Sequence, residues 1–249
     1  GEGGRVAEVT LAATEVAGVD MVHPVGGAQA IAAMAYGTET VRKVDVIVGP
    51  GNAYVAQAKQ QVAGTVGVPS AFAGPSEVVV VADGTSPAEF TATDLVAQME
   101  HGPGGISWLV TWDVAVADAV DVALDRVLED APRGPEIAGT LASSGHCVLV
   151  DDEQQALAVV DAIAPEHLQL MVAAPETLAE RVRNAGAVFL GPWTPTSIGD
   201  YVAGPSHVLP TAGTARFAGA LTVADFTKDI NLVTADPDAL RRLGPHVEA

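Results

Sequence analysis

The sequence predicts an α/β fold in which mostly parallel sheets are flanked by helices. Apolar runs that are too short for helices alternate with amphipathic stretches at helical spacing along almost the whole chain. Hydrophobic residues make up 49% of the 249 residues and aromatic residues only 4%, so the core must consist of Ala, Val, Leu and Ile. This alternation favours crossover helices that cover both faces of a parallel sheet.

The apolar runs each predict a buried strand. In chain order they lie at residues 20–25, 44–48, 78–82, 108–111, 147–150 and 188–190. Ligands of such sheets bind beyond the carboxyl ends of the strands, and the glycine-rich turns of this chain fall there. We therefore expect the functional groups at the carboxyl edge.

The amphipathic stretches predict helices at residues 6–16, 28–35, 53–62, 86–100, 114–128, 153–163, 175–184 and 237–243. Around residues 69–75 the chain is irregular and rich in Gly and Pro, between two strand–helix pairs and a longer run of them. We therefore expect two Rossmann-like domains, residues 1–74 and 75–220, followed by a tail over residues 221–249.

Composition excludes several classes of protein. The formal net charge of -19 arises from 31 acidic and 12 basic residues and would repel a phosphate backbone, so we expect no nucleic-acid partner. A single cysteine, Cys147, excludes an intrachain disulfide, and its apolar surroundings predict a buried strand. No apolar run approaches the ~20 residues of a membrane span, and no signal pattern opens the chain. We expect a soluble, cytoplasmic protein without a membrane partner.

Two glycine turns precede predicted helices, Gly26-Gly27-Ala28-Gln29 and Gly49-Pro50-Gly51-Asn52. A backbone without Cβ atoms approaches a phosphate closely, and the first turn of the following helix offers free N–H donors. Neither turn matches the G-x-G-x-x-G dinucleotide pattern, and a tight strand-to-helix turn explains them equally well.

Two pairs of polar residues are candidates for chemistry. Gln98 and His101 are three apart at the end of a predicted helix and share a face, which suits a metal site, although an amide is an unusual ligand and a helix cap is the commoner role. Glu166 and His167 follow a helix that Pro165 must stop. On a turn both can line one cleft as an acid/base pair; the alternative is an exposed polar dipeptide.

Three further residues lie in segments dense in Gly and Pro. Asp200 is a candidate metal ligand and His207 a candidate substrate contact, although capping or turn formation is equally plausible for Asp200. Ser76 precedes the run at 78–82, and its hydroxyl can bind a ligand or simply belong to a turn. The remaining histidines have no partner at useful spacing and are interpreted as structural or surface residues: His23, His146 and His246.

Taken together and in this order, these segments closely resemble the histidinol dehydrogenase family over nearly the whole chain. The matching segments are GGAQAIAAMAYGTETV, KVDVIVGPGNAYV, AGPSEVVVVAD, AQMEHGPGG, APEHLQL, GAVFLG and GDYVAGPSHVLPT. Their combination is far more specific than any of the spacings above.

The resemblance implies oxidation of L-histidinol to L-histidine through L-histidinal, the last steps of histidine biosynthesis, with Zn²⁺, NAD and an intertwined homodimer. It implies that the first domain contacts NAD, the second binds zinc and substrate, and the tail begins a dimer-contacting segment. The implied zinc ligands, which also meet the substrate, are Gln98, His101 and Asp200. Glu166 is the implied base that activates water, His167 the base for the alcohol proton, Ser76 and His207 substrate contacts, and Gln29 and Asn52 NAD contacts.

Both ends differ from the family pattern. The family carries a further zinc-ligating histidine on a C-terminal segment that crosses the dimer, and an NAD-contacting tyrosine in its N-terminal portion; His246 does not match that ligand. We therefore expect a fragment that supplies three of the four protein ligands. Two alternatives stay open: a related dehydrogenase that acts on another small polar alcohol, and a non-catalytic remnant.

Overall fold

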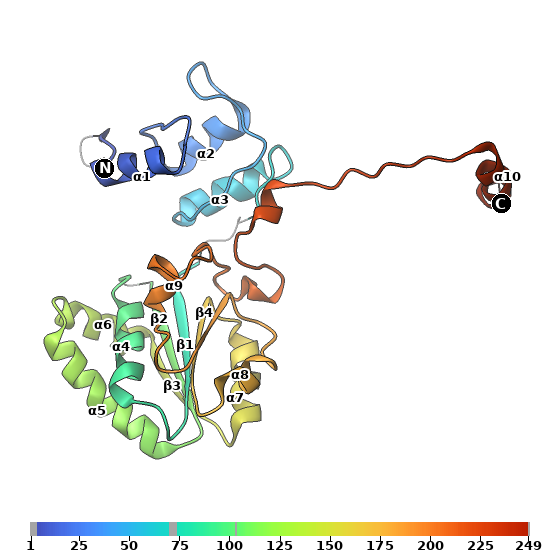
Figure 1. The fold of residues 1–249 in the computed structure, drawn as a ribbon. Coiled ribbons are helices and arrows are strands. Elements are labelled where there is room, and N and C mark those ends of the chain that lie inside the picture. Colours follow the sequence, from blue (N-terminus) through green and yellow to red (C-terminus); the bar gives the residue numbers. More distant parts are fainter. Residues whose placement is uncertain (1–3, 70–73, 103, 249) are drawn as a thin grey trace.

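A computed structural model describes residues 4–69, 74–102 and 104–248 of the chain and contains a five-stranded, all-parallel sheet (Figure 1). The strand order is β3-β2-β1-β4-β5. The strands are β1 Glu77–Ala82, β2 Ile106–Thr111, β3 Gly145–Leu149, β4 His167–Met171 and β5 Ala187–Leu190. The predicted α/β class, with a parallel sheet between helices, is confirmed.

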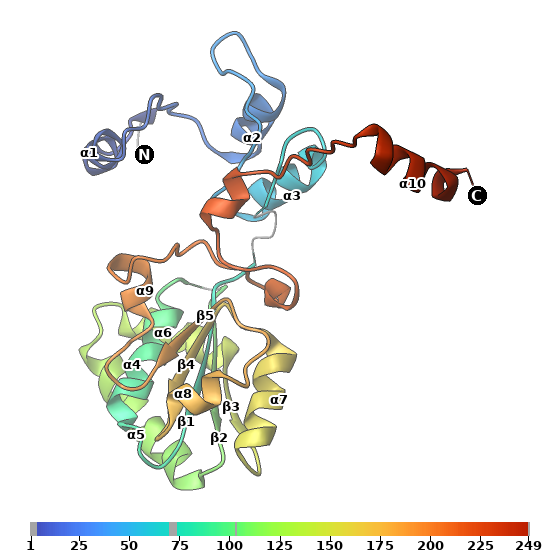
Figure 2. The same ribbon diagram turned by 45° about the vertical axis from the view of Figure 1, so that its right-hand side comes forward.

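Helices cover both faces of this sheet (Figure 2). One face carries α4 (Ala88–Met99), α5 (Val114–Asp130) and α6 (Gly134–Ser144), and the other carries α7 (Glu153–Ile163) and α8 (Pro175–Ala179). Alternation along β1 produces the two layers, because side chains of a strand point to opposite faces in turn. Val78 and Val80 pack toward α4 and α5, whereas Val79 and Val81 pack toward α7 and α8.

The interior strand β4 is absent from the sequence prediction, which placed a turn at Glu166 and His167. His167 is in fact the first residue of β4, and the strand lies between β1 and β5. Gln169 interrupts the apolar run and hides the strand pattern, yet it is fully buried, and its Nε2 donates to the carbonyl of Gly191 at 2.8 Å. Helix α6 was also missed.

Cys147 lies in a strand, as predicted, but the prediction that it is buried is wrong, because its side chain is exposed. Its strand, β3, pairs only with β2 and forms one edge of the sheet. An edge strand keeps one side open, so its apolar residues need not be covered.

The N-terminal region consists of α1 (Glu8–Val16), α2 (Gly27–Tyr36) and α3 (Ala53–Val62). The strand predicted at residues 20–25 is not formed, and that at 44–48 is reduced to one parallel bridge, between Val46 and Gly67. The described residues offer residues 20–25 no neighbouring strand, and their valines stay exposed. A small core still joins α2 and α3: Ile31, Ala35, Ile47, Val62 and Val66.

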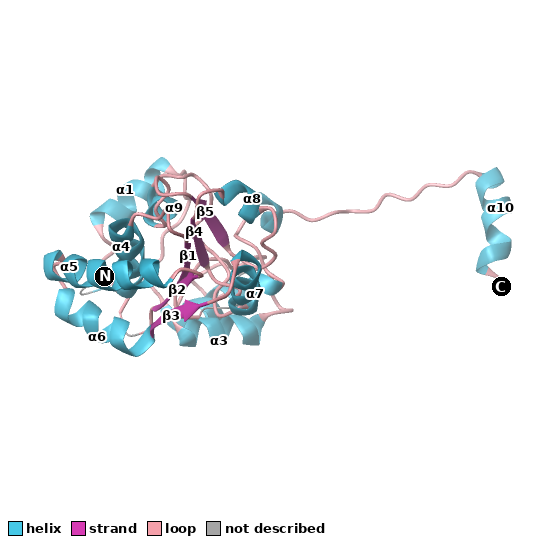
Figure 3. Ribbon diagram, turned by 90° about the horizontal axis from the view of Figure 1, so that it is seen from below, coloured by secondary structure: helices cyan, strands magenta, loops and turns pink. Residues whose placement is uncertain are grey.

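The C-terminal region leaves the body of the molecule (Figure 3). After the short helix α9 (Ser197–Tyr201) and two 3-10 turns, Thr214–Arg216 and Val223–Phe226, an extended arm leads to α10 (Pro237–Val247), which buries no residue. Among the described residues no helix is long and apolar enough to cross a membrane.

Candidate active site

Two cavities lie at the edge of the sheet that faces α3. The larger, of about 390 Å³, brings together residues of the N-terminal region and of the sheet region: Gly49, Gly51, Lys59, Ser76, His101, Glu166, His167, Asp200 and His207 are among its lining residues. The smaller, of about 280 Å³, is lined by Gln98, His101, His167, Thr196 and Asp200, among others. His101, His167 and Asp200 line both cavities, which therefore adjoin.

This edge is the amino edge of the sheet, so the expectation of a site at the carboxyl edge is wrong. Ser76 and Glu77 stand at the start of β1, and Glu166 and His167 at the start of β4. Helix α4 follows β1 and returns toward this edge, so its last turn carries Gln98 and then His101 back to the beginning of the strands. The topology of a strand followed by a returning helix is what places these groups together.

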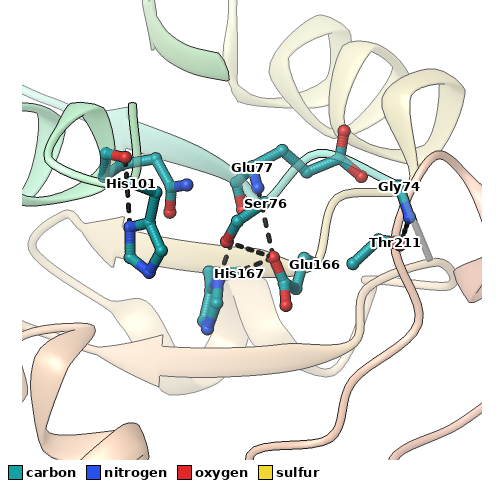
Figure 4. Close-up of polar contacts among 8 residues, drawn as sticks. Gly74, Ser76, Glu77, His101, Glu166, His167 and Thr211 are labelled. Atoms are coloured by element: carbon teal, nitrogen blue, oxygen red, sulfur yellow. Dashed lines mark hydrogen bonds and ion pairs between the residues drawn. The ribbon is translucent and has the colours of Figure 1, made fainter. Parts of the chain in front are cut away.

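Glu166 is buried and held by neighbours from β1 (Figure 4). Its Oε2 accepts a hydrogen bond from the hydroxyl of Ser76 at 2.5 Å and one from the backbone N–H of Glu77 at 3.2 Å. These two hydrogen bonds fix the position of the carboxyl group relative to β1. Glu166 is thus held in a fixed position among the residues that line the larger cavity.

His167 is buried beside it, with Nδ1 lying 3.3 Å from the backbone carbonyl of Glu77 and 3.5 Å from Oε2 of Glu166. A carbonyl only accepts, so in the neutral ring a hydrogen bond here requires the proton on Nδ1. Nε2 then keeps its lone pair. The ring of His167 lines both cavities, and Nε2 is its nitrogen without a proton in this tautomer.

Sequence reasoning missed two buried acids at this edge. Burial raises the pKa of Glu77, with the nearby Glu166 carboxylate adding to the rise and backbone donors, Gly213 first, opposing it. Burial likewise raises the pKa of Asp94 to about 6, opposed by hydrogen bonds from Thr196 and the charge of His167. The acid that begins the otherwise apolar strand β1 was the available signal for Glu77, whereas α4 contains several polar residues and gave none for Asp94. Perturbed carboxyl groups of this kind gather at functional sites.

The three predicted metal ligands line the smaller cavity, from α4, the turn after it and α9. Nδ1 of His101 lies 3.3 Å from the carbonyl of Gln98, which leaves Nε2 for a ligand. The side chain of Gln98 is buried and its Nε2 has no hydrogen-bond partner among the described residues. An amide whose nitrogen points inward presents its oxygen outward, so these residues fit a bound cation.

The amide of Gln98 is essential to that fit. Within residues 4–69, 74–102 and 104–248, no three His, Cys, Asp or Glu side chains lie close enough together to hold a metal ion. His101 and Asp200 alone supply one imidazole and one carboxylate. Zinc sites that act on substrates combine a small number of protein ligands with an open position.

The two predicted NAD contacts are not among the residues that line either cavity. Asn52 caps α3, with its Oδ1 accepting from the backbone N–H groups of Tyr54 and Val55, each at 3.1 Å. Gln29 is an exposed residue of α2. The turn that directly precedes Asn52 does reach the larger cavity, through Gly49, Pro50 and Gly51.

Gly51 is required by packing in that turn. A Cβ atom at this position would come within 2.3 Å of Cγ1 of Val55, so no larger residue fits without a shift of the helix. Behind the turn, Lys59 of α3 is buried and donates to the carbonyl of Gly49, and burial lowers the pKa of its ammonium. The turn is thereby fixed against α3 as one wall of the cavity.

The other histidines lie in different settings. His207 is exposed and lines the larger cavity, and its role as a substrate contact stays a prediction. His146 stacks on Trp108, with ring centroids 4.0 Å apart, and His246 is an exposed residue of α10, far from the sheet (Figure 1).

Comparison with known proteins gives one result throughout. The family model described as histidinol dehydrogenase matches residues 1–249. The curated histidinol dehydrogenase of Cereibacter sphaeroides is 50% identical over 246 residues, covering 99% of this chain and 56% of the relative. That of Rhodospirillum rubrum is 51% identical over 243 residues, covering 97% and 56%. The crystal structure of histidinol dehydrogenase from Elizabethkingia anophelis matches with a TM-score of 0.88 and 36% identity, over 94% of this chain and 54% of that one. The chain thus spans about half the length of these relatives.

Proposed function

The chain belongs to the histidinol dehydrogenase family, and from that premise we propose that the protein oxidises L-histidinol to L-histidine through L-histidinal, with zinc and NAD, in histidine biosynthesis. The observation that carries the proposal is the meeting of Glu166, His167 and the Gln98, His101 and Asp200 set at two adjoining cavities. Fold alone does not set a reaction, whereas such a combination of side chains suits one that removes protons from a bound alcohol.

Gln98, His101 and Asp200 would hold the zinc ion, and Gln29 and Asn52 would contact NAD. When bound, zinc would supply a Lewis acid that orients the substrate, and NAD would supply the acceptor for the hydride of each oxidation. Asn52 keeps its amide NH₂ group for a ligand, because the capping bonds to α3 use only its oxygen.

His167 is assigned the proton of the alcohol. The carbonyl of Glu77 fixes its ring, so Nε2 is the free acceptor, and burial keeps bulk water from competing for it. An imidazole gains and loses a proton near neutral pH, so it can take the hydroxyl proton of the substrate and later release it.

Glu166 is assigned the second oxidation, in which the aldehyde must first take up water. Its carboxylate lines the larger cavity and removes a proton from the attacking water. Ser76 and the N–H of Glu77 hold the carboxylate in place through Oε2, so Oε1 can face the water. Ser76 and His207, which also line this cavity, would contact the substrate.

We further propose that the protein acts as a homodimer. The arm and α10 bury no apolar side chain, and exposed apolar residues recur along them: Ile230, Leu232, Val233, Leu240, Leu243 and Val247. A short helix without packing is marginally stable in water, so a second protomer is the surface these residues would need. Sedimentation of the full-length protein tests this, and a monomer at micromolar concentration would contradict it.

The function is tested by assaying the full-length protein with zinc, NAD and L-histidinol. We expect formation of NADH, two molecules for each L-histidine produced, and loss of activity on treatment with a chelator. Other small amino and sulfonated alcohols serve as comparison substrates, and preference for one of them would identify a related dehydrogenase instead. A folded, zinc-loaded protein that yields no NADH with any of these alcohols would contradict the proposal.

A further inference from the structure

Two polar atoms on the buried face of α4 have no partner. Asp94 is 3% exposed and Gln98 6% exposed, and they are four residues apart, which places their side chains on the same face of the helix. Oδ2 of Asp94 is an acceptor without a hydrogen-bond partner among the described residues, and Nε2 of Gln98 is a donor without one. A buried polar atom that lacks a hydrogen bond costs about 1–3 kcal/mol, so such a pair calls for an explanation.

The other oxygen of Asp94 is occupied. Oδ1 accepts from the backbone N–H and from the hydroxyl of Thr196, both at 3.3 Å. Thr196 is the residue before α9, the helix that carries Asp200. Asp94 therefore ties α4, which carries Gln98, to the short helix that bears another residue of the same cavity.

We infer that Asp94 is a positioning residue for the metal site: Oδ1 fixes α9, and Oδ2, which makes no hydrogen bond with Gln98 in this structure, becomes the acceptor for Nε2 of Gln98 when the oxygen of that amide turns to a metal ion in the cavity it shares with His101 and Asp200. This inference rests on the proposed function, because it assigns Gln98 the role of a metal ligand. Asp94 itself touches neither metal nor substrate.

The chemistry of an amide explains why such a residue is needed. Gln98 can bind a cation only through its oxygen, yet the two ends of an amide have nearly the same shape, and packing alone distinguishes them poorly. A hydrogen-bond acceptor next to the amide nitrogen favours one of the two orientations, since a carboxylate facing the amide oxygen would be repulsive. An ionised carboxylate such as that of Asp94 only accepts hydrogen bonds, so it can pair with the NH₂ end of the amide and not with its oxygen.

The experiment measures metal binding instead of turnover. In the full-length protein, zinc affinity is obtained by competition with a chromophoric chelator, and the ligand set is followed by the visible absorption spectrum of the cobalt(II) form. The Asp94→Asn variant keeps an oxygen that accepts hydrogen bonds from Thr196. It places an NH₂ group, which cannot accept a hydrogen bond, next to the amide nitrogen of Gln98. We expect zinc affinity to fall about 10- to 100-fold, as for other residues that support metal ligands, and the cobalt spectrum to change.

A second substitution separates orientation of the amide from general disruption. In a Gln98→Glu background the introduced carboxylate presents an oxygen to the metal in either orientation. Asp94→Asn should then change zinc affinity by less than about threefold, so the two substitutions are strongly non-additive. An equal loss in both backgrounds would show that Asp94 acts in some other way and would overturn the inference.

Thr196 tests the tie to α9. Thr196→Val keeps the backbone donor and loses the hydroxyl, so we expect a smaller loss of zinc affinity than for Asp94→Asn, and Thr196→Ser should restore it. Thr93→Val and Asp125→Asn, at exposed positions of α4 and α5, are the matched controls and should bind zinc as the unmodified protein does.

The outcomes distinguish the inference from the function on which it rests. If the unmodified full-length protein binds no zinc, the metal-dependent function fails and the inference fails with it. If the unmodified protein binds zinc and folded Asp94→Asn binds it equally well with the same cobalt spectrum, only the inference is overturned. Circular dichroism of each variant establishes that it is folded.

Discussion

The two edges of the parallel sheet use acidic residues in opposite ways. At the carboxyl edge, Asp83 accepts from the backbone and hydroxyl of Thr85 through one oxygen and from the backbone of Ala173 through the other. Asp113 and Asp152, which follow β2 and β3, cap the next helices. The carboxyl groups of these acids accept hydrogen bonds from the turns and helix ends in which they lie.

At the amino edge the acids are buried and only partly satisfied. Glu77 and Asp94 each keep one oxygen without a hydrogen-bond partner among the described residues, and burial raises the pKa of both. The difference teaches that the candidate site lies at the edge where buried polar groups lack hydrogen-bond partners, and not at the carboxyl edge that parallel sheets usually favour.

The largest expected effect is at Glu166. Glu166→Gln keeps an oxygen that accepts from Ser76 and from the N–H of Glu77, so the fold should persist, but the amide is not a base. We expect kcat for L-histidine formation to fall about 10²- to 10⁴-fold. The matched control is Glu153→Gln, at a partly exposed residue in the first turn of α7 at the carboxyl edge, which should retain full activity. Comparable losses in the two variants would remove the contrast between the edges.

The second effect is on stability and concerns Asp94 in the metal-free protein. Because its pKa in the folded state is raised to about 6 from 3.8, the folded state holds the proton more tightly than the unfolded state between these values. The free energy of unfolding should therefore fall as pH rises from about 4 to 6, by up to roughly 3 kcal/mol, through this residue. The Asp94→Asn variant has no titrating carboxyl group at this position. Its free energy of unfolding should therefore increase relative to that of the unmodified protein as the pH rises over that interval. Urea unfolding at several pH values measures it, and a constant difference would contradict it.

The third effect is at the carboxyl edge. Asp83→Ala removes the acceptor for Thr85 and Ala173 and leaves the turn after β1 without its tie to the segment after β4. We expect a loss of about 1–2 kcal/mol in the free energy of unfolding, with kcat unchanged. Thermal unfolding and the NADH assay together test this; a loss of kcat in a folded variant would mean that the carboxyl edge also takes part in the reaction.

The smallest effect compares two threonines that each donate a hydroxyl to an aspartate. Thr85 is exposed and its partner Asp83 has other donors, so Thr85→Val should cost less than about 0.5 kcal/mol and leave zinc binding unaltered. At the amino edge, Thr196→Val leaves the buried Asp94 with one donor fewer. Chelator competition on the two variants side by side should show a change in zinc affinity only for Thr196→Val.

Much of the fold was predictable from local pattern. Strong helical periodicity gave the bounds of α3 and α7 correctly, and β1 was found because its run of valines is unbroken. Strand β4 was missed because Gln169 is polar and yet buried, a choice that depends on the carbonyl of Gly191, 22 residues further along the chain. The strand predicted at residues 20–25 has no neighbour among the described residues, and pairing cannot be read from one segment alone.

The candidate site was predictable in its residues but not in its place. Gln98, His101, Glu166, His167 and Asp200 were each identified by type and spacing, and together by resemblance, yet the edge of the sheet at which they meet depends on the path of α4 back from β1. Asp94 and Glu77 were not candidates, because the sequence does not show which side of α4 faces α9 or that Glu77 begins a buried strand. Gln29 and Asn52 remain predictions as NAD contacts.

The position of the candidate site at the amino edge of the sheet also determines the sign of the electrostatic field in the larger cavity. A helix that follows a parallel strand brings its C-terminal end to this edge, with the partial negative charge of unpaired carbonyls, and α4 presents that end beside His101. Across the larger cavity, α3 presents its N-terminal end, with partial positive charge, at the Gly49–Asn52 turn. The cavity is thus polarised, and we expect a cationic group of a ligand to face α4 and α9 and an anionic group to face α3. Raising the ionic strength should weaken binding of a charged ligand far more than that of a neutral analogue.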